Sequence, residues 1–153
     1  MRQLRTNPGA RLKVLRLRTD GAARGNPGPA GAGILIEDDQ GNRLQARHKW
    51  LGQMTNNQAE YHALVEGLKS VTDWKPDRLE ILLDSKLVVE QVRGQYKTKV
   101  PELQRLLIDV MRLLKQFPSY EIKHVAREEN RGADHLANMA IDERLPPKKK
   151  FGG

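Results

Sequence analysis

Apolar and polar side chains alternate along the chain at two periods, which predict its strands and helices. Leu15 and Leu17 alternate with Arg16 and Arg18, which is the period of a strand that ends at Asp20-Gly21. Similar alternation or a short apolar run predicts further strands at 33–37, 43–51, 79–84 and 120–126. Apolar residues three and four apart predict helices at 56–71, 86–94, 101–117 and 130–141. This order predicts a mixed sheet with helices packed on it.

Polar and conformationally special residues mark the ends of these elements. Thr55-Asn56-Asn57 and Ser85 precede two helices as capping residues, and Pro101 begins a third. Gly25 to Pro29 predicts a turn after the first strand. We find no internal repeat and no glycine-rich phosphate loop after any strand.

The bulk composition restricts the class of protein. A chain of 153 residues suits one domain with a real core. It has no cysteine, so any metal must be held by oxygen or imidazole. The absence of a signal-peptide core and of an apolar run of about 18 residues predicts a cytoplasmic protein with no membrane contact.

The net charge of +8 is concentrated at the chain ends. Residues 1–13 carry four cations and no acid, and 146–153 carry three lysines and no acid, whereas the body is nearly neutral. We therefore divide the chain into a basic tail (1–11), one domain (12–142) and a second basic tail (143–153). Basic ends are compatible with nucleic-acid binding and equally with simple solvation.

Four acids stand where a free carboxylate is costly. Asp20 and Asp84 end apolar strands, while Glu60 and Asp134 share helix faces with small or apolar residues. Individually, Asp20 fits a turn acid, Glu60 a helix-surface acid, and Asp84 and Asp134 helix caps. Together they would raise one another's pKa unless a cation lay between them, and an oxygen-only ligand set suits Mg²⁺ or Mn²⁺.

Four sequence segments resemble the type 1 ribonuclease H family in order and spacing: TDGAARGNPGPAG, TNNQAEYHAL, ILLDS and NRGADHLAN. The resemblance covers about residues 12–142. It implies an α/β ribonuclease H-like fold, with a five-stranded mixed sheet whose second strand is antiparallel, flanked by helices. It also implies an endoribonuclease that uses two Mg²⁺ ions, or Mn²⁺, to hydrolyse the RNA strand of RNA/DNA hybrids, giving 3′-hydroxyl and 5′-phosphate ends.

The resemblance also assigns roles to residues. Asp20, Glu60, Asp84 and Asp134 match the catalytic metal ligands, with Asp20 between the ions, Glu60 and Asp84 on one side, and Asp134 on the other. Further residues match positions that bind the hybrid: Asn26, Thr55, Asn56, Asn57 and Gln58. Thr55 to Asn57 also fit a helix cap, which does not exclude phosphate binding.

Three departures distinguish this sequence from many family members. The connection AREENRGAD contains no histidine before the last acid, and Arg127 or Glu128 is expected in that space. Residues 94–99 are too short for a basic protrusion, and residues 1–11 are too short for a separate hybrid-binding domain. The alternatives are the same chemistry on double-stranded RNA or RNA–DNA junctions, or a non-catalytic hybrid-binding module. We expect a monomer without a protein partner.

Overall fold

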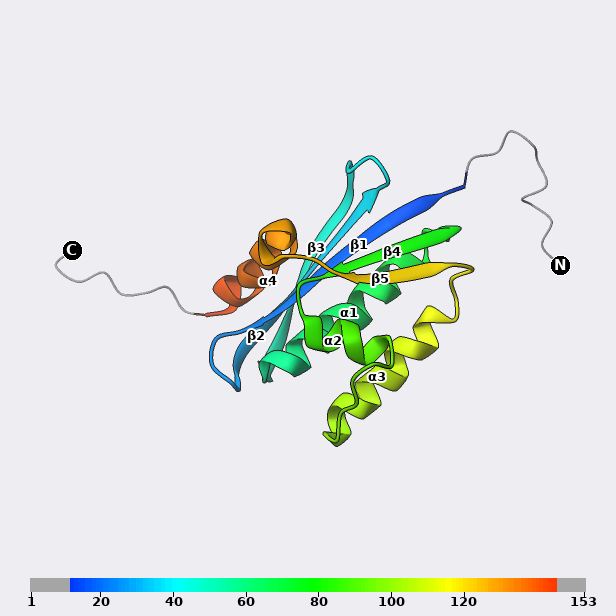
Figure 1. Cartoon of the computed structure of the whole chain (residues 1–153). Coiled ribbons are helices and arrows are strands. Elements are labelled where there is room, and N and C mark those ends of the chain that lie inside the picture. The colour runs from blue at the N-terminus through cyan, green and yellow to red at the C-terminus, as the bar shows by residue number, and fades with distance from the viewer. Residues whose placement is uncertain (1–11, 146–153) are drawn as a thin grey trace, which may run out of the picture.

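Five strands form one mixed sheet in the order β3-β2-β1-β4-β5 (Figure 1). The computed structural model describes residues 12–145. β1 (Val14–Ala23) pairs antiparallel with β2 (Gly28–Asp38), which pairs antiparallel with β3 (Arg43–Met54). On its other side β1 pairs parallel with β4 (Arg78–Leu83), and β4 pairs parallel with β5 (Tyr120–His124). The expected five-stranded α/β sheet with an antiparallel second strand is confirmed.

Helices cover both faces of this sheet. The helices are α1 (Asn56–Thr72), α2 (Lys86–Val92), α3 (Pro101–Leu114) and α4 (Arg131–Arg144), the last preceded by a 3₁₀ turn, η2 (Arg127–Asn130). The main core includes Leu17, Ile34, Leu64, Ile81 and Val110, from three strands, α1 and α3. None of the helices within residues 12–145 is long and apolar enough to cross a membrane.

The first strand is longer than the sequence pattern predicts. The predicted end at Asp20 is wrong, because β1 continues to Ala23 and Asp20 lies opposite Gly33 of β2. The glycines in this region allow close helix packing. A Cβ on Gly21 would lie 2.1 Å from the backbone of Ala59 in α1, and one on Gly33 would lie 1.9 Å from the Ala133 carbonyl oxygen in α4.

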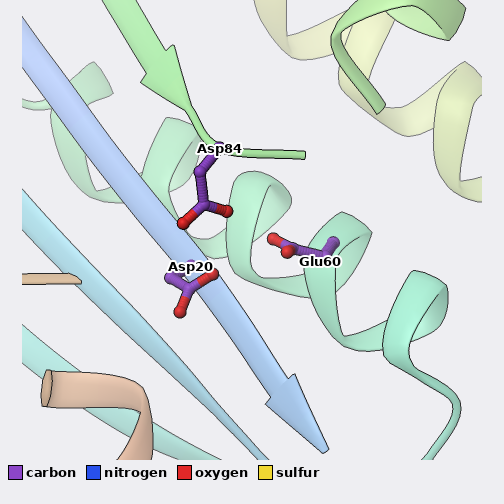
Figure 2. Close-up of side chains that lie close together, drawn as sticks. All are labelled: Asp20, Glu60 and Asp84. Atoms are coloured by element: carbon purple, nitrogen blue, oxygen red, sulfur yellow. The ribbon is translucent and has the colours of Figure 1, made fainter. Parts of the chain in front are cut away.

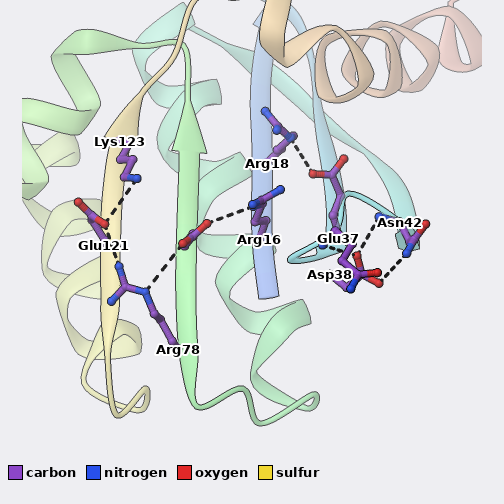
Figure 3. Close-up of polar contacts among 10 residues, drawn as sticks. Arg16, Arg18, Glu37, Asp38, Asn42, Arg78, Glu121 and Lys123 are labelled. Atoms are coloured by element: carbon purple, nitrogen blue, oxygen red, sulfur yellow. Dashed lines mark hydrogen bonds and ion pairs between the residues drawn. The ribbon is translucent and has the colours of Figure 1, made fainter. Parts of the chain in front are cut away.

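A ladder of paired charges crosses the sheet surface away from α1 (Figure 3). Arg16 contacts Glu80 at 3.1 Å, Arg18 contacts Glu37 at 2.9 Å, and Arg78 contacts Glu121 at 2.9 Å. Cross-strand pairs of opposite charge keep a half-exposed sheet surface compatible with water and contribute little individually to stability. The arginines that alternate with core leucines in β1 therefore have a structural explanation.

Candidate active site

Four acidic side chains, each from a different part of the fold, line one cavity of about 410 Å³. Asp20 comes from β1, Glu60 from α1, Asp84 from the residue after β4, and Asp134 from the first turn of α4. Carboxylate oxygens of Asp20, Glu60 and Asp84 lie within 4.8 Å of one another (Figure 2). Asp134 lies close enough to Asp20 to help raise the pKa of that residue. The structure therefore brings together all four acids that the sequence singled out.

The sheet itself explains how acids from both faces reach Asp20. β1 pairs with β4 only from Val14 to Arg18, and beyond that point β1 is paired with β2 alone. Close packing of α1 on Gly21 brings Glu60 to this part of β1, where the Gly21 amide donates a 3.1 Å hydrogen bond to Glu60 Oε1. Close packing of α4 on Gly33 brings Asp134 toward Asp20 from the other face.

The electrostatics of the cluster are unfavourable without a cation. Burial, followed by the charges of Glu60 and Asp84, raises the pKa of Asp20 to about 10. Burial also raises the pKa of Glu60 to about 8, although the Gly21 amide opposes the shift. The pKa of Asp84 is raised mainly by burial, against a hydrogen bond from Asn130 and the charge of Arg127.

This donor set fits a hard divalent cation. Every candidate ligand is a carboxylate oxygen, which is what Mg²⁺ and Mn²⁺ prefer. A divalent ion would compensate the mutual repulsion that raises the pKa of Asp20. None of the residues that line the cavity is a histidine or a cysteine, so the site lacks the ligands typical of zinc.

The residues expected to bind the hybrid gather at the start of α1. Thr55 caps the helix by accepting from the Gln58 amide, and Gln58 Oε1 accepts from the Thr55 amide at 2.8 Å. The Asn56 amide donates to Asn26 Oδ1 at 2.9 Å, and Asn56 lines the carboxylate cavity. Asn57 is exposed in the first turn. The helix-cap interpretation of Thr55 is confirmed, while the roles of these residues toward a substrate stay a prediction.

The loop before Asp134 brings an arginine to the candidate site. Arg127 lines the carboxylate cavity and also an adjoining one of about 250 Å³, which Glu128 and Arg131 line as well. His124 and His135 are exposed and do not line the main cavity, and His48 contacts Glu143 at 2.8 Å.

Two residues of the cavity were missed by the sequence reasoning. Asn138 donates to Asp134 Oδ1 at 3.3 Å, and its position one turn after Asp134 on the same helix face is a signal that could have found it. Arg24 contacts Asn138 Oδ1 at 3.1 Å and Asp142 at 2.7 Å. Its pairing partners lie more than a hundred residues away, so no local pattern indicated them.

Comparisons with known proteins agree with this fold and site. The sequence model of the family described as Reverse transcriptase-like matches residues 18–140. A ribonuclease HI of Halobacterium salinarum is 41% identical over 124 residues, which are 81% of this chain and 62% of that protein. A ribonuclease H of Coxiella burnetii is 34% identical over 148 residues, covering 86% of this chain and 92% of that protein.

The structural comparison gives the same result. The crystal structure of LC11-RNase H1 in complex with RNA/DNA hybrid has a TM-score of 0.82 and 38% identity, covering 86% of this chain and 99% of that one. The five-stranded mixed sheet, with acids gathered where β1 and β4 cease to pair, is that of a ribonuclease H-like protein. The chain belongs to the type 1 ribonuclease H family. It spans 62% of the halobacterial relative and 36% of a bifunctional protein of Mycobacterium tuberculosis.

Proposed function

We propose that this chain is an endoribonuclease that hydrolyses the RNA strand of RNA/DNA hybrids, leaving 3′-hydroxyl and 5′-phosphate ends. The observation that carries the proposal is the convergence of Asp20, Glu60, Asp84 and Asp134 on one open cavity. Family membership and the hybrid bound to LC11-RNase H1 support the choice of substrate. A pure binder of phosphate would gain affinity by losing these four acids, which weakens the alternative of a non-catalytic module.

Asp20, Glu60 and Asp84 would hold one divalent ion, and Asp20 with Asp134 a second, with Mg²⁺ as the proposed metal and Mn²⁺ as a substitute. Such ions supply Lewis acidity and a more acidic bound water for phosphodiester hydrolysis. The chain's contribution is to hold four carboxylates on rigid elements. Asn138 donates to Asp134, and the Gly21 amide donates to Glu60, so two of the acids are oriented by neighbours.

The start of α1 is the proposed contact to the hybrid. Asn56 borders the cavity. The side chains of Asn26 and Gln58 accept hydrogen bonds from the backbone amides of Asn56 and Thr55 at the start of the helix. The positive end of the helix dipole favours a phosphate there, and the amide side chains suit minor-groove edges and 2′-hydroxyls. This arrangement would place the RNA backbone beside the carboxylates while the DNA strand lies along the start of α1.

Replacing single metal-binding acids tests the proposal. Glu60→Gln and Asp84→Asn keep side-chain shape and remove charge, so both variants should fold normally and lose Mg²⁺-dependent cleavage by roughly a hundredfold or more. Glu66→Gln is the matched control, because Glu66 lies on the same helix and contacts Lys49 outside the cavity. Full activity in folded Glu60→Gln and Asp84→Asn proteins would reject the assigned site.

A further inference from the structure

A second, mainly apolar groove lies away from the carboxylates, between the segment that follows α2 and the outer face of α3. It has a volume of about 750 Å³ and shares no lining residue with the carboxylate cavity. Leu107, Ile108 and Met111 of α3 form one wall, and Tyr96 lies on the other. Leu107 and Met111 also pack against the edge of the core, so the apolar lining residues that the core does not explain are the exposed Tyr96 and Ile108.

The exposed apolar side chains of the described residues are concentrated here. Of the six large apolar residues with high exposure, two line the groove, Tyr96 at 43% and Ile108 at 55%, and Val100 at 49% lies between them in the sequence. Isolated exposed apolar residues are ordinary, but several gathered around a groove are typical of a binding surface. The region therefore has the composition of an interface.

Hydrogen bonds hold the groove open in a defined shape. The Tyr96 amide donates to the Glu90 carbonyl oxygen at 3.1 Å at the end of α2. Gln104 Nε2 on α3 donates to the Thr98 carbonyl oxygen at 2.8 Å. Both ends of the connecting segment are thus fixed to helices, and a partner would meet a preformed surface, which lowers the entropy cost of binding.

The charges at the rim select the kind of partner. The residues that line the groove include three cations, Lys97, Arg112 and Lys115, and no acid. Arg112 and Asp109 are 3.9 Å apart and both well exposed, which makes their pair weak and leaves the guanidinium able to bind another anion. An apolar floor with a cationic rim complements a segment that alternates acidic and apolar side chains.

The geometry points to this groove as a docking site for an acidic peptide segment that carries apolar side chains, contributed by a partner protein. The apolar side chains would enter between Tyr96 and Ile108, and the carboxylates would contact Lys97, Arg112 and Lys115. A nucleic acid is less complementary, because the walls are mostly aliphatic and offer few surfaces for base stacking. The sequence had predicted no protein partner, and this surface is the reason to revise that expectation.

A peptide-display selection on the full chain tests the inference. Panning a library of random linear peptides should enrich sequences that combine acidic and apolar residues, with affinities that fall as salt rises. The selected peptides should bind at least about tenfold more weakly to Ile108→Ser and to the double variant Lys97→Glu/Lys115→Glu. Arg105→Glu on the exposed face of α3 and Leu44→Ser on β3 are the matched controls and should bind normally.

Other outcomes would overturn the docking site. Failure to enrich any peptide, or enrichment of peptides without acids, would reject the proposed chemistry. Binding that persists in the folded groove variants would place the peptide elsewhere. Weaker hybrid binding by the groove variants would assign the surface to nucleic acid, and self-association abolished by Ile108→Ser would assign it to a second copy. Peptide binding to Asp84→Asn should equal wild type, which keeps this test independent of the proposed catalysis.

Discussion

The side-chain amide of Asn130 donates a 2.9 Å hydrogen bond to the backbone carbonyl of Thr19, the residue before Asp20. Asn130 is fully buried at the N-cap position of α4, yet its side chain makes no capping bond to that helix. It instead joins the start of α4 to β1, one helical turn before Asp134. This hydrogen bond therefore ties the strand that carries Asp20 to the helix that carries Asp134.

Asn130→Ala should therefore weaken both the fold and the site. The change leaves the Thr19 carbonyl without its donor and should cost about 1–3 kcal/mol in the free energy of unfolding, measured by urea denaturation. We expect cleavage to fall further than the fraction of folded protein explains, because Asp134 loses its fixed distance from Asp20. Asn57→Ala, at an exposed residue of α1, should leave stability unchanged. Unchanged stability of Asn130→Ala would contradict the bridging role.

The raised pKa values predict an unusual pH dependence of stability in metal-free protein. Asp20, with a pKa of about 10, and Glu60, with a pKa of about 8, keep protons in the folded state that the unfolded chain releases near pH 4. The stability that these two protons add to the fold is therefore complete below about pH 4. The part due to Glu60 is lost as the pH rises to about 8, and the part due to Asp20 as it rises to about 10. Each group lowers stability by about 1.4 kcal/mol per pH unit in its window.

Thermal melting in EDTA between pH 6 and pH 9 measures this effect. The melting temperature should fall as pH rises, and saturating Mg²⁺ should reduce the slope by compensating the carboxylate charge. Asp20→Asn should also flatten the slope in EDTA. A melting temperature that is constant or rises over this range would show that the carboxylates are not crowded as described.

Gly33→Ala should destabilise the protein through helix packing. Its Cβ would lie 1.9 Å from the Ala133 carbonyl oxygen, so α4 must move away from the sheet and take Asp134 with it. We expect a loss of about 1–3 kcal/mol or more, together with reduced cleavage. Gly132→Ala is the control, since its Cβ would meet only side-chain atoms of Leu35 and Arg43 at 3.1 and 3.2 Å. Equal stability of the two variants would refute close packing as the role of Gly33.

Arg127, which lines the carboxylate cavity, should contribute to substrate binding. Arg127→Ala removes a cation from the carboxylate cavity, so kcat/KM for the hybrid should fall about tenfold while Mg²⁺ affinity does not weaken. Arg127→Lys should restore part of the loss. Steady-state cleavage and calorimetric Mg²⁺ titration separate the two effects. If Arg127→Ala cleaves as wild type does, the arginine has no part in the reaction.

The sequence was sufficient to predict most of the strands and helices and the four acids that line the cavity, because the patterns that indicate them are local. Alternation around Leu15 and Leu17 predicted β1, and Thr55 predicted the start of α1. Gly21 was predicted to end the first strand and Gly33 to begin the second, whereas both lie inside longer strands. Glycine is required at both positions because a helix from a distant part of the chain packs closely there. The partners of Asn130 and Arg24 are likewise set by tertiary packing, and no residue spacing encodes them.

The most direct test of the central claim is cleavage of one end-labelled RNA strand presented as RNA/DNA hybrid, double-stranded RNA and single-stranded RNA. The account predicts cutting of the hybrid alone, with Mg²⁺ and not with EDTA, giving 3′-hydroxyl and 5′-phosphate ends, and loss of cutting in Asp84→Asn. Comparable cutting of double-stranded RNA would contradict the hybrid specificity. Tight hybrid binding without any Mg²⁺-dependent cutting would contradict the proposed catalysis.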